Sequence, residues 1–375
     1  MPPARVLVTA TLAMAMSLLV VFGVAGAPTA HASAPAMTGY TFTRMVAGTP
    51  ERDLVDCALN NLGQVAVASW ESSTPGGELR TTVVRADGAS VTPIAGPSSE
   101  LGGWPGTWIT GVGINDAGQV AAGVLTNGIV GRIVLGDGGP VRVVARSGPG
   151  ERFYQLWDGI SLNAQGRVAF VGRTLSSAGL YTGNGGPLAT RFVNTDASTH
   201  YGDIGTPVLN AAGQLAFGQR DADGFFSIYR IERDGSVTRL HRSPSRNVSL
   251  WLSMNRAGRV VISRPPAWIS TVRNAGKTLV ASNADGFTAV SGGFLNDLGQ
   301  VVFNAVTAVH PNGGVYTGAT PSFSRVLGSG DVLNGHAVYS ARTCGSTPIN
   351  NAGQVALRVT YSDFTEAVVR ADPVP

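Results

Sequence analysis

A nine-residue phrase built on Asn-x-x-Gly recurs seven times along the chain and constrains the fold more than any other feature. Each copy has an apolar residue before the Asn, and Gln or Arg followed by apolar residues after the Gly. Between Asn60 and Asn350 the six intervals average about 48 residues, a period typical of β-propeller blades. The aligned asparagines are Asn60, Asn115, Asn163, Asn210, Asn255, Asn296 and Asn350.

The phrase predicts a hairpin turn. An Asn at the first turn position can bond its side chain to the backbone two residues on, and a Gly at the fourth can adopt positive φ. The residues after the Gly run apolar, as in 168–171 (Val-Ala-Phe-Val), which is typical of a strand buried on both faces. We therefore expect these Asn and Gly residues to be turn residues and not catalytic groups.

Two further strand-like segments follow each phrase. In the third unit they are 179–182 and 188–193, and in the fourth they are 225–232 and 236–240. Hydrophobic residues make up 43% of the chain and charged residues 13%, with 50 glycines, which favours short strands and tight turns over helical bundles or disorder. The sequence predicts an all-β, seven-bladed β-propeller with four-stranded antiparallel blades.

The two ends of the chain predict how the ring closes. The seventh unit stops after a third strand at 365–370, so its outer strand is missing. The segment 40–46 precedes the first Asn turn and has the pattern of an outer strand. We expect this N-terminal strand to complete the last blade and cover its free edge.

The two cysteines of the chain support this closure. Cys57 lies in the first unit and Cys344 in the seventh, 287 positions apart, yet closure makes their inner strands neighbours. In an exported protein such a pair predicts a disulfide. The alternative is two separate buried thiols.

The first 32 residues have the pattern of a signal peptide. Arg5 precedes an apolar run over 6–27, and Ala30-His31-Ala32 offers the small-x-small pattern of a cleavage site. The alternative is a retained membrane anchor, since the run is long enough to span. We expect 1–32 to be a signal peptide and 33–375 a single propeller domain that is secreted, extracellular and free of the membrane.

Charge and motifs exclude several function classes. The net charge is +4 and arginines such as Arg44, Arg142 and Arg239 are scattered, so we expect no nucleic-acid surface. The spacing of Asp221, Asp223 and Glu232 resembles a calcium loop, but phenylalanines occupy positions that need a ligand and a Gly. We expect no metal site and no cofactor, and the common catalytic motifs are missing from the sequence.

The phrase Asn-x-x-Gly-Gln/Arg-Val-Ala-Phe, with Gly-Leu/Val-Tyr after it, resembles a largely uncharacterised family of secreted bacterial tandem-repeat proteins named after that motif. The resemblance covers all seven units and implies the repeat type and export. It implies no substrate and no catalytic residues. Four units depart from the phrase, because its Phe is replaced at Val67, Ala122, Ile262 and Leu357.

The units differ most just before each Asn turn, in the loops that lead into the innermost strands. In a propeller such loops surround one mouth of the central channel, where ligands commonly bind. Aromatic rings and polar groups in these loops could stack on sugar rings and hydrogen-bond them. The alternative is that the rings fill gaps between blades. The candidate ligand-binding residues are Trp104, Trp108, Tyr154, Trp157, Tyr201, Asp203 and Trp251.

Three functions are compatible with this pattern. The first is a monomeric recognition protein that binds a glycan or another extracellular polymer. The second is a carbohydrate-active enzyme, a polysaccharide lyase or hydrolase, because a lyase needs a base and a group that neutralises a uronate. The third is a scaffold for a protein partner. No motif places an acid–base pair, so we favour binding. The catalytic candidates are His200, Tyr201, His336, Tyr339 and Arg342.

Overall fold

The computed structural model describes residues 39–72, 80–96, 107–126, 130–194, 203–221, 223–246, 250–273 and 276–374. Met37–Pro375 is one compact unit. The predicted signal peptide 1–32 lies outside the described residues, as do three site candidates, Trp104, His200 and Tyr201.

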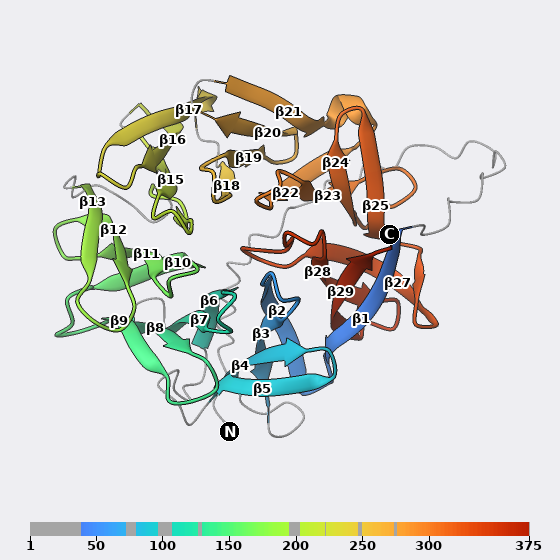
Figure 1. Ribbon diagram of the computed structural model, residues 1–375, viewed down its shortest axis with the longest axis horizontal. Helices are drawn as coiled ribbons and strands as arrows, with labels where there is room; N and C mark the ends of the chain where they lie inside the picture. The colour runs from blue at the N-terminus through green and yellow to red at the C-terminus, as the bar shows by residue number, and fades with distance from the viewer. Residues whose placement is uncertain are drawn as a thin grey trace, which may run out of the picture. The chain divides into compact units, whose positions relative to one another are not determined.

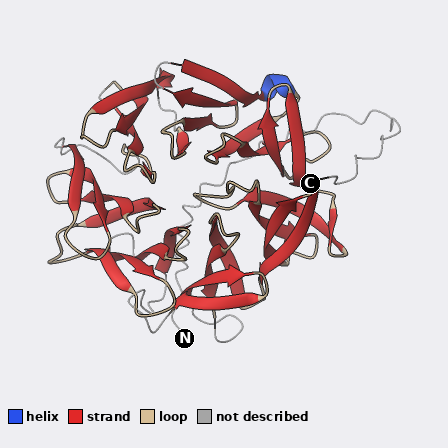
Figure 2. Cartoon of the chain, viewed as in Figure 1, coloured by secondary structure: helices blue, strands red, loops and turns tan. Residues whose placement is uncertain are grey.

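Seven antiparallel sheets follow one another around a ring, and strands account for nearly all of the regular structure (Figures 1 and 2). The predicted all-β, seven-bladed propeller is confirmed. In the described part of the chain the one helix is a short 3-10 turn, η1 (Asn283–Asp285). Each of the first six blades has four strands in chain order, innermost first.

The strand bounds follow the repeat. Blade 1 contains β2 (Arg52–Leu59), β3 (Val65–Glu71), β4 (Arg80–Asp87) and β5 (Ser90–Ala95), and blade 2 contains β6 (Thr107–Ile114), β7 (Val120–Thr126), β8 (Val130–Gly136) and β9 (Arg142–Ser147). Blade 3 contains β10 (Gln155–Leu162), β11 (Val168–Arg173), β12 (Ala178–Gly183) and β13 (Ala189–Asn194), and blade 4 contains β14 (Val208–Leu209), β15 (Leu215–Arg220), β16 (Phe225–Ile231) and β17 (Val237–Arg246). Blade 5 contains β18 (Trp251–Met254), β19 (Val260–Arg264), β20 (Trp268–Arg273) and β21 (Gly276–Ser282), and blade 6 contains β22 (Ala289–Leu295), β23 (Val301–Val306), β24 (Gly314–Ala319) and β25 (Ser322–Gly328).

The seventh blade joins the two ends of the propeller. Its strands are β26 (Val332–Leu333), β27 (His336–Thr343), β28 (Val355–Tyr361), β29 (Glu366–Pro373) and the N-terminal β1 (Tyr40–Ala47). β1 pairs antiparallel with β29, with Thr43 opposite Arg370 (blue beside dark red in Figure 1). The predicted closure by the N-terminal strand is therefore confirmed.

Blade 7 differs from the prediction by one additional strand. The short β26 pairs with β27, which makes this sheet five-stranded. Asn334 and Gly335 join the two strands, and both have positive φ, at 54° and 83°. Asn-Gly is the preferred pair for such a two-residue hairpin, so local turn chemistry explains the extra strand.

The Asn-x-x-Gly phrase forms the predicted hairpin in every unit. In the first unit Asn60 Oδ1 accepts from the backbone N–H groups of Leu62 and Gln64, and Gly63 has φ 78°. Each Asn also uses Nδ2 to donate to the backbone oxygen of the corresponding Asn in the next blade. Seven such bonds of 2.8 to 3.3 Å connect the Asn turns around the ring.

Seven hydrophobic clusters fill the spaces within and between the blades. The Phe of the repeat phrase is fully buried where it occurs, at Phe170, Phe217 and Phe303. Tyr181 of the following Gly-Leu-Tyr stacks on Phe170, with ring centroids 5.9 Å apart. The repeat phrase is therefore conspicuous because its residues build both the turns and the core.

Candidate functional site

The predicted ligand-binding side chains that are exposed lie at the beginnings of the innermost strands, opposite the Asn turns. We call this side of the ring the lead-in face. Trp108 is 50% exposed, Tyr154 40% and Trp251 57%, and the catalytic candidate Tyr339 is 44% exposed. These four residues belong to blades 2, 3, 5 and 7, so they do not form one cluster by themselves. Their role in binding stays a prediction.

Two other candidates have structural contacts. Trp157 is 2% exposed, packs in a core cluster, and donates from Nε1 to Gln155 Oε1 at 3.2 Å. Asp203 forms an ion pair with Arg220, with 3.3 Å between Oδ1 and Nε. Trp157 therefore fits the alternative interpretation, in which the rings fill gaps between blades. Neither residue lines the groove between blades 7 and 1.

An open groove of about 580 Å³ lies between blades 7 and 1 on the lead-in face. Its walls are the connection from β1 to β2, the end of β3, and the turn from β28 to β29. We call it the blade 7–1 groove. Its lining residues include Thr49, Arg52, Asp53, Trp70, Arg358, Asp363, Phe364, Thr365 and Glu366.

Aromatic rings line this groove and extend beyond it on both sides. Phe364, in the β28–β29 turn, is 75% exposed and lies 5.8 Å from the ring of Tyr339. Trp70, at the end of β3, meets Trp108 edge to face at 5.9 Å. Two candidates from the sequence, Trp108 and Tyr339, therefore flank the groove. Each contacts a ring of the groove lining, Trp70 or Phe364, that was not predicted from the sequence.

The backbone of Phe364 has an unusual conformation. Its φ is 63°, in the left-handed region that large side chains rarely adopt. The corresponding turn of blade 4 has the same two backbone hydrogen bonds, and there Gly224 occupies the position with φ 81°. Blade 7 therefore places an exposed aromatic ring where blade 4 uses Gly.

Ion pairs hold the two arginines of the groove. Arg52 Nε lies 2.6 Å from Glu71 Oε1, and Arg358 Nη2 lies 2.9 Å from Glu366 Oε1. Hydrogen bonds from the Thr365 side chain and backbone N–H hold the pKa of Asp363 below its usual range. Asp363 is therefore ionised at neutral pH.

The catalytic candidates of blade 7 do not converge. His336 is exposed, with Nδ1 3.6 Å from Asp363 Oδ2 and its ring 5.4 Å from that of Tyr361. Tyr339 instead contacts Phe364. Arg342 is exposed and stands opposite Arg358 in the β27–β28 ladder.

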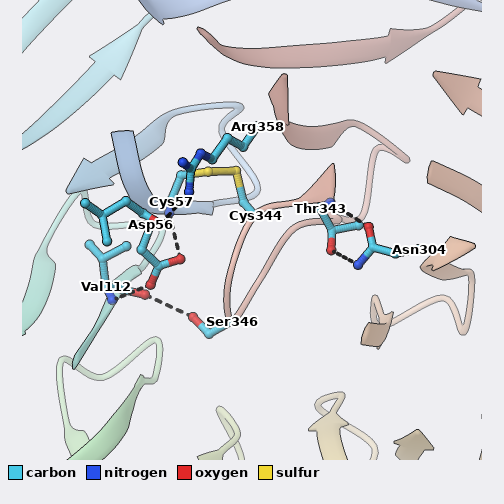
Figure 3. Close-up of a disulfide and its surroundings, with 9 residues drawn as sticks. Asp56, Cys57, Val112, Asn304, Thr343, Cys344, Ser346 and Arg358 are labelled. Carbon is cyan, nitrogen blue, oxygen red and sulfur yellow. Dashed lines mark hydrogen bonds between the residues drawn. A yellow bond between two sulfur atoms is a disulfide. The ribbon is translucent and has the colours of Figure 1, made fainter. Parts of the chain in front are cut away.

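A disulfide lies next to the groove and joins the first and last blades (Figure 3). Cys57 of blade 1 and Cys344 of blade 7 have Cα atoms 4.8 Å apart, which confirms the predicted bridge. Arg358, which lines the groove, donates to the backbone oxygen of Val55, two residues before Cys57. The adjacent backbone pairs across the blades, since Gly345 N donates to Cys57 O at 2.9 Å.

The carboxylate of Asp56 connects three blades beside this disulfide (Figure 3). It accepts from the N–H groups of Cys57, at 2.8 Å, and of Val112 in blade 2, at 3.0 Å, and it lies against Gly345 of blade 7. Desolvation raises the pKa of Asp56 to about 6, although these donors and the charge of Arg358 act in the opposite direction. A Cβ at Gly345 would lie 2.2 Å from the carboxylate.

Two further properties concern metals and membranes. Within the described ranges, no group of three or more His, Cys, Asp or Glu side chains is placed to hold a metal ion. In the same part of the chain, no helix has the length and apolar character needed to cross a bilayer.

No protein-family model matches the sequence, and no curated protein does. Many solved structures are similar in fold, including these three. The β-propeller domain of the Trilobed protease from Pyrococcus furiosus, described as having an open velcro topology, shares 10% identity over 88% of this chain and 95% of its own, with TM-score 0.58. A catalytically inactive virginiamycin B lyase from Staphylococcus aureus, solved with quinupristin, shares 11% over 89% and 100%, with TM-score 0.53. YCF48 from Cyanidioschyzon merolae shares 15% over 88% and 98%, with TM-score 0.51. These likenesses show the β-propeller fold alone.

Proposed function

We propose that this β-propeller is a secreted, monomeric recognition protein that binds a glycan or a similar extracellular polymer in the blade 7–1 groove. The observation that carries the proposal is Phe364. Its ring is 75% exposed, and its backbone is in a conformation that costs a residue other than Gly about 1–3 kcal/mol. An exposed ring stabilises the fold little, so packing does not offset this conformational cost. Ligand binding is a role that explains why a ring is present at this position.

The composition of the groove supports a sugar ligand. Trp70 and Phe364 offer ring surfaces on which the apolar C–H face of a sugar can stack. Charged and hydroxyl side chains around them, such as Thr49 and Asp53, can hydrogen-bond sugar hydroxyls. Apolar rings with a few polar groups are typical of ligand sites.

Secretion is part of the proposal. The disulfide between Cys57 and Cys344 supports it, because disulfides persist in oxidising compartments. The apolar segment and small residues of 1–32 support it as well. The test is the intact mass of protein recovered from the culture medium of an expressing bacterium. We expect a chain beginning at Ser33, and a cell-bound protein of full length would contradict secretion.

We favour binding over catalysis because the His–carboxylate contact described beside the groove, His336 with Asp363, is 3.6 Å long and His336 does not line the groove. His336 and Tyr339 contact different partners. Asp56 has a raised pKa, but backbone N–H groups of blades 1 and 2 already occupy its carboxylate. A candidate general base must be able to reach the proton that it removes.

The experiment is a binding screen on immobilised polysaccharides with matched variants. Phe364→Ala removes the exposed ring of the groove, and Trp251→Ala removes another exposed ring, 57% exposed, from blade 5. We expect Phe364→Ala to weaken binding at least about tenfold and Trp251→Ala to leave it within about twofold. Equal losses in both variants, or none in Phe364→Ala, would overturn the proposal.

The same samples test the enzyme alternative. Polymer incubated with the protein is analysed for chain length and for the absorbance of unsaturated sugars. We expect no change in either. Shortened chains that disappear in a His336→Ala variant would replace binding with polysaccharide cleavage.

A further inference from the structure

We infer that the blade 7–1 groove takes an uncharged sugar chain and disfavours polyuronates. This inference rests on the proposed function and adds the chemical class of the ligand. It is based on the charged side chains that line the groove and on the ion pairs that its two arginines already form.

The basic side chains of the groove are already neutralised. Arg52 is held by Glu71 at 2.6 Å. Arg358 is held by both carboxylate oxygens of Glu366, at 2.9 and 3.2 Å, and also donates to the Val55 carbonyl. A ligand carboxylate at either arginine would share the cation with a glutamate that already pairs with it, and the charge of that glutamate would repel the ligand.

Two further carboxylates lie in the groove wall. Asp53 is exposed at the start of β2, and Asp363 is in the turn that carries Phe364. With both arginines paired, these two side chains leave the groove with an excess of negative charge. A chain with one carboxylate per sugar would bring several like charges close to them.

Two ionisable groups of the neighbouring strand β27, Arg342 and His336, do not reverse this balance. Arg342 stands opposite Arg358 on the neighbouring strand and is not part of the groove lining. His336 lies 3.6 Å from Asp363 and offsets its charge only when the imidazole is protonated. The side chains that line the groove therefore leave it acidic when this imidazole is neutral.

An uncharged sugar chain meets none of these penalties. Its hydroxyls can donate to the oxygens of Asp53 and Asp363 without displacing an ion pair. Its C–H faces can stack on Trp70 and Phe364, and those of a polyuronate can do the same. The expected difference in affinity between neutral polymers and polyuronates is therefore electrostatic.

The test compares two polymer sets at pH 8 and low salt. The neutral set is β-1,4-glucan, β-1,3-glucan, xylan, mannan and chitin, and the acidic set is alginate, pectate and hyaluronan. We expect the strongest binding from the neutral set, at least about tenfold above any polyuronate, with the difference shrinking as salt screens the charges. A polyuronate as the strongest ligand would overturn the inference.

Variants separate this inference from the proposed function. In the double variant Asp53→Asn, Asp363→Asn the ratio of polyuronate to neutral-polymer affinity should rise at least about threefold, because Asn keeps the shape and removes the charge. An unchanged ratio would overturn the inference even if sugars bind. If no polymer in either set binds wild-type protein, the proposed function itself fails.

Discussion

The side chain of Asn350 donates from Nδ2 to the backbone oxygen of Asn60 at 3.0 Å, across 290 positions of sequence. This bond completes the circle of seven turn asparagines. Each of these side chains bonds its own turn through Oδ1 and the next blade through Nδ2, and all seven are at most 6% exposed. Because both the Oδ1 and the Nδ2 of such a buried side chain are hydrogen-bonded, it specifies one partner and one distance between neighbouring blades.

Replacing one of these asparagines with Asp tests the circle. Asn60→Asp keeps the acceptor of the turn but removes the Nδ2 donor and places a carboxylate 3.0 Å from the Asn115 oxygen. Since the lost donor and the new charge are both buried, we expect a loss of about 3 kcal/mol or more in the free energy of unfolding, measured by urea titration. Asn184→Asp, in an exposed turn, is the matched control and should change it by less than about 0.5 kcal/mol. Similar losses in both variants would mean that the circle contributes nothing specific.

The space beside Asp56 predicts a strict need for Gly at position 345. A Cβ there would lie 2.2 Å from Asp56 Oδ1, so Gly345→Ala must displace the carboxylate or the strand. We expect a loss of about 1–3 kcal/mol in the free energy of unfolding, as for other overpacked sites. Gly96→Ala is the control, because no atom lies within 4 Å of its added Cβ. A neutral Gly345→Ala would contradict the close approach.

The carboxyl of Asp56 makes the stability of the fold depend on pH. Its folded pKa of about 6 is above the ordinary value of 3.8, so the folded state holds a proton between these values that the unfolded state has released. The contribution to the free energy of unfolding is therefore full below pH 3.8 and falls by up to about 3 kcal/mol as pH rises past 6.

The measurement is the difference between wild type and Asp56→Asn from pH 4 to pH 7.5. Burial and Lys277 lower the pKa of His241, which acts with the opposite sign because the unfolded state then binds the extra proton. His241 is present in both proteins, so the difference isolates Asp56. We expect wild type to lose stability relative to Asp56→Asn as pH rises. Parallel curves would show that Asp56 does not titrate in this range.

The disulfide and the β1–β29 pairing close the ring independently. Cys57→Ser with Cys344→Ser removes a bond that spans 287 positions, for which chain entropy alone gives about 6 kcal/mol. Because β1 still pairs with β29, we expect the variant to fold but to melt at a lower temperature in calorimetry. Unreduced wild type is the reference, and an equal melting temperature would show that strand pairing alone closes the ring.

The repeat made most of this fold predictable from the sequence. A turn needs particular residues at fixed spacing, so the phrase identified the blades, and the unpaired segment 40–46 identified the closure. The Asn-Gly pair at 334–335 is an equally clear local signal for a hairpin, but the prediction from the repeat did not use it. The bonds between Asn turns were not predictable, since they depend on the distance between neighbouring blades.

The site was predicted only in part, because ligand sites depend on which side chains remain exposed. Trp108 and Trp157 both belong to lead-in segments, yet one is exposed and the other packs in the core. Trp70 lies at the end of β3 and Phe364 in the β28–β29 turn, and they became candidates only once blades 1 and 7 were adjacent. Phe364 carries no sequence signal, because its unusual φ is visible only in the structure.

Phe364→Gly gives the sharpest prediction, because stability and binding should change in opposite directions. Gly accepts φ 63° without strain, as Gly224 does in the matching turn of blade 4, and an exposed ring contributes little packing. We expect the free energy of unfolding to rise by about 1 kcal/mol, since relief of strain exceeds the flexibility that Gly adds to the unfolded chain. Polymer binding should fall at least about tenfold in the same protein. The reverse change, Gly224→Phe, should destabilise blade 4 without creating binding. If Phe364→Gly is less stable and binds normally, the ring has a packing role and the groove is not the ligand site.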